Sequence, residues 1–362
     1  MLKDHDNIEK MSVYLAERIK KYTGRPLRIM EVCGTHTHEN YRHGIRSILP
    51  LGIKLVAGPG CPVCVTPSGL VDSALYLSQR KNVIICSFGD LIRVPGAKGA
   101  KGASLARARA EGADIRVVYS PLDALNIAIE NPNSEVVFLA VGFETTTPAS
   151  CLAVKKAADG GVRNFSILCA CKTMTNAYYV LAGSVDAFLY PGHVSAVTGM
   201  GVYKKLETEG ISGVVAGFGV AELLTAITVI IEKSQLNTPF AINCYPRVVT
   251  EQGNLAALSL INEIMEPCDN QWRGLGLVKG SGLRLREKYR DFDAEVRFNI
   301  PEMPETESNG CRCGEVLRGD IEPEQCPHYG KKCTPENPVG ACMVSNEGAC
   351  AAYYRYGDFQ RK

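Results

Sequence analysis

Reactive side chains are concentrated in residues 33–39, where the chain reads CGTHTHE. A thiolate binds soft metals, an imidazole is the commonest nitrogen ligand of metals in proteins, and a carboxylate transfers protons. Three of the six histidines, His36, His38 and His43, lie in or close to this stretch. A lone cysteine is usually an inert buried side chain, but this grouping predicts a functional site that contains Cys33 and His36.

A second stretch with reactive thiols, residues 58–64, reads GPGCPVC. Its glycines permit tight backbone geometry, and Cys61 and Cys64 have the Cys-x-x-Cys spacing of a disulfide or of half a metal site. The sequence contains no second Cys-x-x-Cys pair, which argues against a zinc site built from two such pairs.

Six cysteines lie within residues 311–350, a segment rich in proline and glycine. Such a segment builds little core of its own, so we expect a bound metal cluster to hold it together. The best candidate ligands are Cys326, Cys333 and Cys350. A cluster takes four thiolates, and spacing alone does not choose Cys311 or Cys313 as the fourth or exclude Cys342. A zinc site is the alternative.

The elements that must position these stretches are short runs of apolar and β-branched residues. Residues 27–32 lead into Cys33 and residues 53–57 lead into the glycines of the second stretch, so both stretches are predicted to be loops at strand ends. Ligands bind at the carboxyl ends of strands in open α/β sheets. Further strands are predicted at residues 82–88, 115–119, 135–141, 164–171, 185–190, 213–218 and 240–245.

The first half of the chain is echoed in the second. Residues 142–146, GFETT, follow a predicted strand as residues 33–36 do, and the sequence around Gly192 resembles that around Gly60. Strands alternate with helical patterns, which is typical of parallel sheets with right-handed crossovers. We therefore predict an α/β fold with two similar parallel-sheet domains, residues 1–130 and 131–245, facing one another across a cleft.

The alternation of strand and helix patterns ends after residue 245. We predict a helix at residues 255–265, a glycine-rich turn at 272–278 and a short basic helix at 283–289, followed by the cysteine-rich segment. Residues 246–362 are thus expected to form a small C-terminal domain that binds an iron–sulfur cluster.

Composition excludes several classes of function. The formal charge of +2 over 362 residues gives no reason to expect binding to nucleic acid or to a membrane surface. Neither a signal peptide nor a long apolar span is present, so we expect a cytoplasmic protein. The cytosol keeps thiols reduced, and the 15 cysteines then point to metal binding or redox chemistry rather than structural disulfides.

Taken together, CGTHTHE, GPGCPVC, GFETT and the ending SNEGAC at residues 345–350 resemble the HypD family of hydrogenase maturation proteins over essentially the whole chain. The resemblance implies a scaffold for assembling the Fe(CN)2CO group of [NiFe] hydrogenases. It implies a HypC-type chaperone and a HypE-type cyanide donor, supplied by HypF, as partners. It also implies a [4Fe-4S] cluster bound by Cys311, Cys326, Cys333 and Cys350.

Roles for the other residues follow as hypotheses. Cys33, ionised by its surroundings, anchors the iron, and Cys64 or Cys61 is the second thiolate. His36 and, from the facing half, Glu144 orient or protonate the site, while Cys61 and Cys64 cycle between dithiol and disulfide. The groups expected to hydrogen-bond cyanide are Thr35, Thr145 and the backbone N–H groups of residues 58–60.

Three other classes were weighed. A cluster-dependent thiol–disulfide oxidoreductase would use Cys61 and Cys64 as its active pair. A zinc hydrolase built on His36, His38 and Glu39 is weak, because the spacing fits neither His-Glu-x-x-His nor its inverse, and on an extended chain Glu39 would point away from the histidines. A radical enzyme is disfavoured because its usual cysteine trio is absent.

Overall fold

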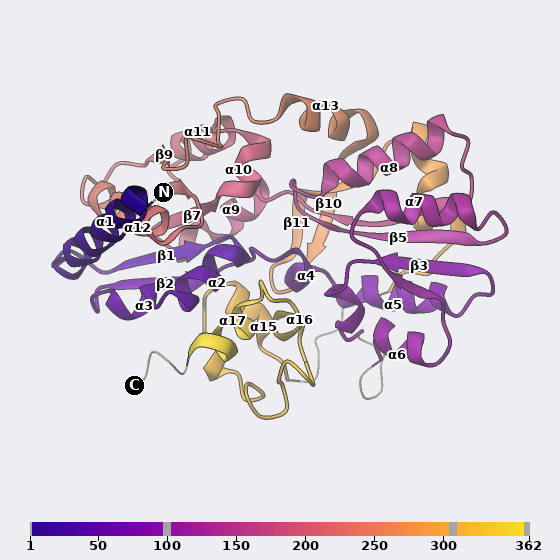
Figure 1. The fold of residues 1–362 in the computed structure, drawn as a ribbon, viewed down its shortest axis with the longest axis horizontal. Coiled ribbons are helices and arrows are strands. Elements are labelled where there is room, and N and C mark those ends of the chain that lie inside the picture. The colour runs from indigo at the N-terminus through magenta and orange to yellow at the C-terminus, as the bar shows by residue number, and fades with distance from the viewer. Residues whose placement is uncertain (1, 97–102, 304–309, 358–362) are drawn as a thin grey trace.

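The computed structural model describes residues 2–96, 103–303 and 310–357, with side chains from residue 8 onward. Figure 1 shows two parallel sheets side by side, a two-stranded hairpin between them, and the C-terminal part below. This arrangement confirms the predicted fold class of two parallel-sheet α/β units with a cysteine-rich C-terminal part. No helix among the described residues has the length and apolar character needed to span a bilayer.

The first sheet, called sheet A, has five parallel strands in the order β2-β1-β7-β8-β9. Its members are β1 (Leu27–Glu31), β2 (Ile53–Ala57), β7 (Ala187–Pro191), β8 (Gly213–Ala216) and β9 (Ala241–Asn243). Nearly every residue of the first four strands is buried, as expected for a parallel sheet covered on both faces. The helices around it are α1 (Leu2–Lys20), α2 (Gly34–Arg42), α3 (Ile45–Ile48), α10 (Gly192–Thr198), α11 (Gly201–Thr208) and α12 (Val220–Ser234).

The second sheet, called sheet B, has four parallel strands in the order β4-β3-β5-β6. Its members are β3 (Val83–Ser87), β4 (Ile115–Val117), β5 (Glu135–Gly142) and β6 (Phe165–Cys171). The helices beside it are α5 (Ser68–Ser78), α6 (Leu105–Ala110), α7 (Pro121–Glu130), α8 (Thr147–Asp159) and α14 (Ala294–Phe298), with the 3-10 turns η1 (Leu91–Arg93) and η3 (Glu287–Phe292).

The sheets do not follow the predicted boundary at residue 130. Sheet A joins strands from residues 27–57 to strands from residues 187–243, and sheet B is formed from the intervening chain. The chain therefore passes from one sheet to the other and back. Chain order is only a partial guide to pairing, since roughly a third of consecutive strands are not neighbours, and the sequence echoes mark strand ends rather than sheet membership.

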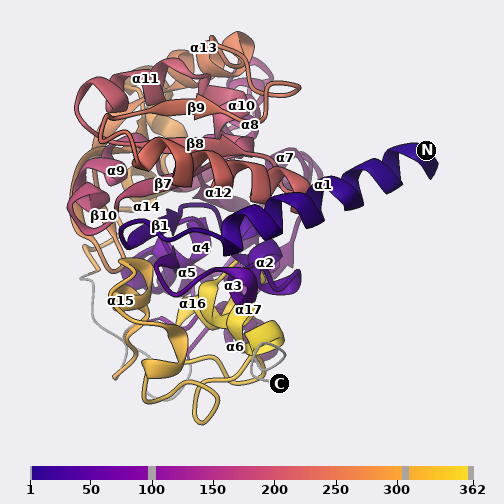
Figure 2. The same ribbon diagram turned by 90° about the vertical axis from the view of Figure 1, so that its left-hand side faces the viewer.

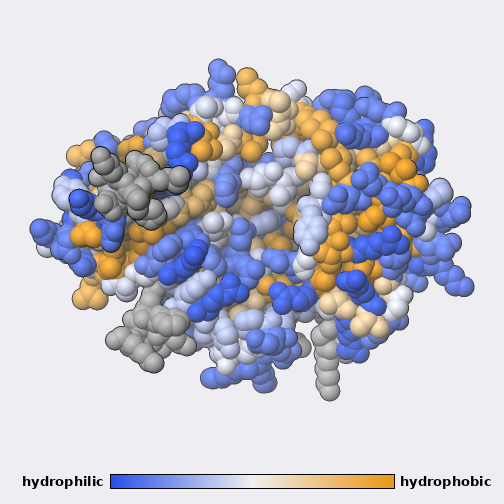
Figure 3. All heavy atoms as spheres, in the orientation of Figure 1, coloured by the Kyte–Doolittle hydropathy of each residue, from blue (hydrophilic) through white to orange (hydrophobic). Residues whose placement is uncertain are grey.

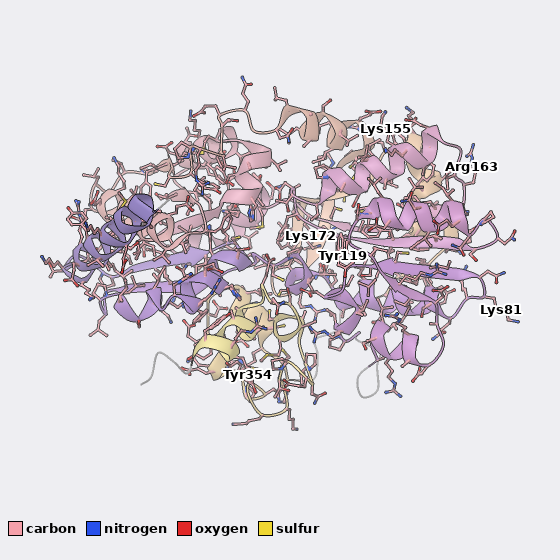
Figure 4. All side chains as sticks on the ribbon, in the orientation of Figure 1. Lys81, Tyr119, Lys155, Arg163, Lys172 and Tyr354 are labelled. Atoms are coloured by element: carbon pink, nitrogen blue, oxygen red, sulfur yellow. The ribbon has the colours of Figure 1, made fainter. Side chains whose placement is uncertain are left out.

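An antiparallel hairpin, β10 (Met265–Trp272) and β11 (Gly276–Leu285), stands where a turn and a basic helix were predicted. Gly274 and Gly276 have positive φ values of 85° and 75°, which let the chain reverse. The buried Lys172 ties this hairpin to sheet B, because its ammonium donates to the Asn270 side chain and to the Gln271 carbonyl. Figure 4 shows Lys172 near the middle of the molecule.

The C-terminal part contains little regular structure. Its elements are α15 (Cys313–Leu317), η4 (Pro323–Gln325), α16 (Ala341–Val344) and α17 (Ala349–Tyr356). Figure 2 shows α17 beside α2 and α3, and α17 packs on α2. The visible face of this part is mostly hydrophilic (Figure 3), whereas five of its six cysteines are buried.

The remaining helices complete the junction between the sheets. They are α4 (Pro62–Val65), α9 (Thr175–Leu181), η2 (Ala182–Ser184) and α13 (Leu255–Ile264), the last at the predicted position. One hydrophobic core at this junction includes Cys61, Cys64, Phe143 and Trp272 together with cysteines of the C-terminal part. The Cys-x-x-Cys stretch and the C-terminal cysteines thus meet in a single buried core.

Candidate functional site

The stretch that contains Cys33 begins a helix and is not the predicted loop. Strand β1 ends at Glu31, Cys33 is the extended N-cap residue, and α2 starts at Gly34. Tertiary packing favours this helix: a Cβ at Gly34 would lie 2.5 Å from the Cβ of Glu347, so a glycine lets the C-terminal part approach. Cys33 is therefore fixed at a helix N-terminus at the carboxyl end of a parallel strand.

The thiol of Cys33 is not ionised by its surroundings, which corrects the hypothesis made from the sequence. Its side chain is almost wholly buried, and burial raises the pKa of the Cys33 thiol to about 11. The N–H groups of His36 and Thr35 favour the thiolate but do not outweigh burial, and the Glu347 carboxylate opposes it. A thiol of this kind loses its proton when a metal ion replaces it.

His36 holds α2 against sheet A. Its ring is fully buried, its Nε2 lies 3.0 Å from the carbonyl oxygen of Gly217, and its Nδ1 has no partner. Burial lowers the pKa of His36 to about 4, so the ring is neutral and Nε2–H donates to Gly217. The ring packs 4.9 Å from that of Phe218. His36 thus positions the helix that carries Cys33.

Glu39 of α2 lies close to two histidines. It pairs with His43 at 3.0 Å and lies 3.8 Å from His38, whose Nδ1 is 3.3 Å from the Asn346 carbonyl oxygen. Within the ranges described, no three His, Cys, Asp or Glu side chains are arranged to hold a single metal ion. A zinc hydrolase built on this stretch therefore finds no support. The expectation that Glu39 points away from the histidines is wrong for His38, and it is His36 that is separately buried against the Gly217 carbonyl.

The two reactive stretches lie directly against each other. A Cβ at Gly60 would lie 2.4 Å from the Cα of Cys33, so only glycine allows this approach. The Gly34 N–H donates to the Gly60 carbonyl at 3.2 Å. Cys61 follows at once, which brings it next to Cys33 in space.

Cys61 and Cys64 form one end of a row of sulfur atoms. Cys61 caps the short helix α4, and its Sγ accepts a 3.3 Å hydrogen bond from the Cys64 N–H. The Cys64 thiol contacts the sulfurs of Cys61 and Cys342, and burial raises the pKa of Cys64 well above its usual value. Cys342 in turn contacts Cys313 and Cys350. The row therefore runs from the Cys-x-x-Cys pair into the C-terminal part.

One cavity gathers all six C-terminal cysteines. Its lining includes Cys311, Cys313, Cys326, Cys333, Cys342 and Cys350. A Cβ at Gly340 would lie 2.5 Å from the Sγ of Cys311, and the Val339 N–H donates to the Cys333 Sγ at 3.3 Å. In a [4Fe-4S] cluster each thiolate binds its own iron, so sulfurs spread around a cavity with backbone donors suit a cluster.

Two residues at this site, Glu347 and His193, were not predicted as site residues from the sequence. The carboxylate of the exposed Glu347 accepts a 2.9 Å hydrogen bond from the Thr35 hydroxyl. It raises the pKa of Cys33 and opposes the burial that lowers the pKa of His193. The His193 ring stacks on Phe218 at 4.0 Å. The available signals were the position of Glu347 within SNEGAC and the echo at Gly192, immediately before His193.

Glu144 and Thr145 lie in the turn that follows β5. The Glu144 Oε1 accepts a 2.9 Å hydrogen bond from the Met174 N–H, while Oε2 is buried without a partner. Burial raises the pKa of Glu144 to about 7. Thr145 is exposed on the turn before α8. The contacts described for Glu144 are with the segment after β6, so a direct approach to Cys33 stays a prediction.

Residues 344–347 join this site to both sheets. Ser345 donates to the Asp90 carboxylate at 3.0 Å, and Arg93 donates to the Val344 carbonyl at 3.1 Å, both beyond the end of β3. On the other side Glu347 is bound by Thr35 at the start of α2. The C-terminal part is thus wedged between the carboxyl ends of β1 and β3.

A comparison with protein families identifies this architecture. The model of the family described as "HypD: Hydrogenase formation hypA family" matches residues 9–357. The chain belongs to the HypD family. It is 44% identical to the hydrogenase maturation factor HypD of Rhodobacter capsulatus over 353 residues, covering 95% of this chain and 93% of that protein.

Other HypD relatives are similar along the same length. The hydrogenase maturation factor HypD of Escherichia coli is 41% identical over 362 residues, which cover 97% of this chain and 95% of that protein. That of Cupriavidus necator is 42% identical, with 96% and 95% covered. The resemblance noted from the four sequence motifs is confirmed, and this HypD-family chain is a hydrogenase maturation factor.

Proposed function

We propose that this HypD-family chain is a cytoplasmic scaffold on which the Fe(CN)2CO group of [NiFe] hydrogenases is assembled. A HypC-type chaperone and a HypE-type cyanide donor are its partners in this proposal. The observation that carries it is the contact between the Cys33 and Gly60 segments beneath Glu347. This contact sets Cys33 beside the Cys-x-x-Cys pair.

Cys33 is the anchor for the iron. It retains some exposure, at 8%, whereas Cys61 and Cys64 retain 2% and none. A thiol whose pKa is about 11 is inert until a cation displaces its proton, which suits a site that must bind iron and later release it. The second thiolate is Cys64 or Cys61, and the contact of Cys64 with Cys342 favours Cys61.

The groups around Cys33 suit diatomic ligands on iron. Cyanide nitrogen accepts hydrogen bonds, and the His193 ring is the donor proposed for it. The donors expected from the sequence are already used, because the Thr35 hydroxyl donates to Glu347, and the Gly58 and Gly60 N–H groups donate to backbone carbonyls. Pro59 has no N–H. Glu347 positions Thr35 through their 2.9 Å hydrogen bond. Thr145 and Glu144 serve from sheet B in this proposal, with Glu144 able to hold a proton near neutral pH.

The row of sulfurs serves redox exchange. A Cys342 thiolate attacks the Cys64 sulfur of a Cys61–Cys64 disulfide, and Cys61 leaves as a thiolate. Cys313 then attacks Cys342, which releases Cys64 and closes a Cys313–Cys342 disulfide. Two electrons and two protons pass to Cys61 and Cys64. The contacts of Cys342 with both Cys64 and Cys313 support this order.

A [4Fe-4S] cluster on Cys311, Cys326, Cys333 and Cys350 completes the proposal. It would pass on single electrons that it receives from an external iron–sulfur or flavin reductant. Two such electrons, with two protons, would reduce the Cys313–Cys342 disulfide back to thiols. The shared cavity and the backbone donor to Cys333 support this ligand set.

Infrared spectroscopy tests the scaffold directly. Protein purified without oxygen, together with its HypC-type chaperone, is expected to show CO and CN stretches from bound iron. Cys33→Ala should abolish all of these bands without changing the melting temperature by more than a few degrees. Cys244→Ala, which removes a half-buried thiol elsewhere, is the matched control and should keep them. Bands that persist in Cys33→Ala would remove Cys33 from this role.

The row of sulfurs also supports a second candidate, a cluster-dependent thiol–disulfide oxidoreductase. Such an enzyme would reduce a generic disulfide substrate catalytically and would carry no diatomic ligands on iron. Burial of Cys61 and Cys64 argues against large disulfide substrates. Turnover on a small disulfide together with absent infrared bands would favour this alternative.

A further inference from the structure

A buried arginine at the tip of the β10–β11 hairpin contacts the helix of the Cys-x-x-Cys pair. Arg273 is only 6% exposed. Its backbone N–H donates to the Val65 carbonyl at 2.9 Å, and its Nε donates to the Thr66 carbonyl at 3.0 Å. These two carbonyls lie at the end of α4, which begins one residue after Cys61. The arginine therefore fixes the far end of the helix that presents Cys64.

The same turn packs against the start of the cluster-binding part. Gly274 has a φ of 85°, and a Cβ there would lie 2.6 Å from the Cα of Gly314. Arg318 donates to the Gly274 carbonyl at 2.5 Å. Cys313 precedes Gly314, so Arg273 lies between α4 and the cavity of cysteines. The Cys311 thiol and Arg273 both lower the pKa of Cys313, against a net rise to about 12.

The charge of Arg273 is not neutralised by any partner that the structure describes for it. Its Nη2 is buried and makes no hydrogen bond, and its described acceptors are neutral carbonyl groups. Guanidinium stays charged at all accessible pH values. A buried cation without a counter-charge costs several kcal/mol, so this position is expected to face negative charge in the functional state.

We propose that Arg273 is a positioning residue whose permanent charge stabilises the reduced, more negative state of the cluster beside it. The inference rests on the proposed function, because the cluster and its thiolate ligands supply the negative charge that Arg273 lacks. Reduction adds an electron next to this cation. Removing the cation therefore disfavours reduction and lowers the reduction potential.

The test compares three variants of the full-length protein with its cluster reconstituted. Arg273→Met removes the charge and keeps most of the volume, and Arg273→Lys restores the charge. Arg318→Met is the matched control, since Arg318 contacts the same turn but is paired with Asp320 at 2.8 Å. Iron and sulfide content is measured first, and a mediated redox titration followed by electron paramagnetic resonance gives the cluster potential.

Arg273→Met is expected to disfavour cluster reduction at least tenfold, a potential about 59 mV lower for one electron. Arg273→Lys should recover most of this shift, and Arg318→Met should show none. A full cluster with an unchanged potential in Arg273→Met overturns the inference. If this variant fails to fold, Arg273→Gln, which keeps a donor without the charge, takes its place with the same expectations.

A second measurement separates the inference from the proposed function. The Cys61–Cys64 disulfide potential is titrated against dithiothreitol in protein without a cluster, and it should be the same in all variants because two protons accompany the two electrons. Wild-type protein without iron and sulfide would refute the cluster proposal, whereas equal cluster potentials in fully loaded variants would show that Arg273 has only a structural role.

Discussion

Burial, more than hydrogen bonding, sets the protonation of the ionisable side chains in this site. It raises the pKa of Cys33 to about 11, lowers that of His36 to about 4 and raises that of Glu144 to about 7. Cys33 and His36 are therefore neutral near pH 7, whereas about half of Glu144 is ionised at that pH. The Glu347 carboxylate is then the charge that acts directly on Cys33.

The buried carboxyl group of Glu144 should make stability depend on pH. Its pKa rises from 4.5 in the unfolded chain to about 7 in the fold, so its stabilising contribution is complete below pH 4.5 and is lost as pH rises through 7. The difference corresponds to about 3 kcal/mol. Glu144→Gln should abolish it. Urea unfolding of both proteins from pH 5 to pH 8.5 measures the effect, and parallel curves would contradict it.

The carboxylate of Glu347 controls the reactivity of Cys33. Glu347→Gln removes the negative charge that raises the Cys33 pKa and can still accept the Thr35 hydrogen bond. Alkylation of Cys33 by iodoacetamide at pH 8 in metal-free protein should become about two- to fivefold faster, the size expected of an exposed charge pair. Peptide mass spectrometry gives the rate. Glu336→Gln, at an exposed position away from Cys33, should leave the rate unchanged.

Contacts between elements also depend on single glycines. At Gly60 an added methyl group would lie 2.4 Å from the backbone of Cys33, so β2 and α2 would have to separate. Gly60→Ala is expected to cost about 1–3 kcal/mol of stability and to abolish iron binding. Gly52→Ala meets nothing within 4 Å and is the control. Thermal unfolding measures the stability of each variant, and iron analysis measures its bound metal. Equal stability of the two variants would contradict this explanation of the contact.

The C-terminal cysteines should separate into two roles. Cys326→Ser is expected to lose the cluster, because it removes a proposed ligand from the shared cavity. Cys342→Ser should keep the cluster but leave the Cys61–Cys64 disulfide unreduced, because it interrupts the sulfur row. Iron and sulfide analysis gives the first result, and thiol counting after dithionite gives the second. Full iron and sulfide in Cys326→Ser would refute the ligand set.

At the scale of the whole molecule, the sequence predicted the strands better than their pairing. All nine parallel strands of the described residues lie within or next to predicted ranges, since runs such as residues 83–86 and 136–141 are continuously apolar and rich in valine and isoleucine. The pairing of β1 with β7 joins residues far apart in the chain and leaves no local signal. The hairpin was missed because residues 265–272 contain a proline and alternate only weakly.

The candidate site shows the same limit. Cys33, Cys61 and Cys64 were predicted because each lies in a short stretch with its own chemical character. Glu347 and His193 reach the site from the C-terminal part and from the end of β7, and their role depends on where the fold places them. Arg273 belongs to no recognisable sequence motif, and only its burial beside α4 in the structure points to a role.

The segments that surround Cys33 are synthesised at very different times. Strand β1 emerges early, but its partner β7 begins only at residue 187, and Glu347 arrives near the end of the described chain. A nascent chain therefore carries Cys33 without the surroundings that define its site. Under the scaffold function proposed above, selective iron capture would wait for a nearly finished polypeptide, and half-made chains would not sequester metal.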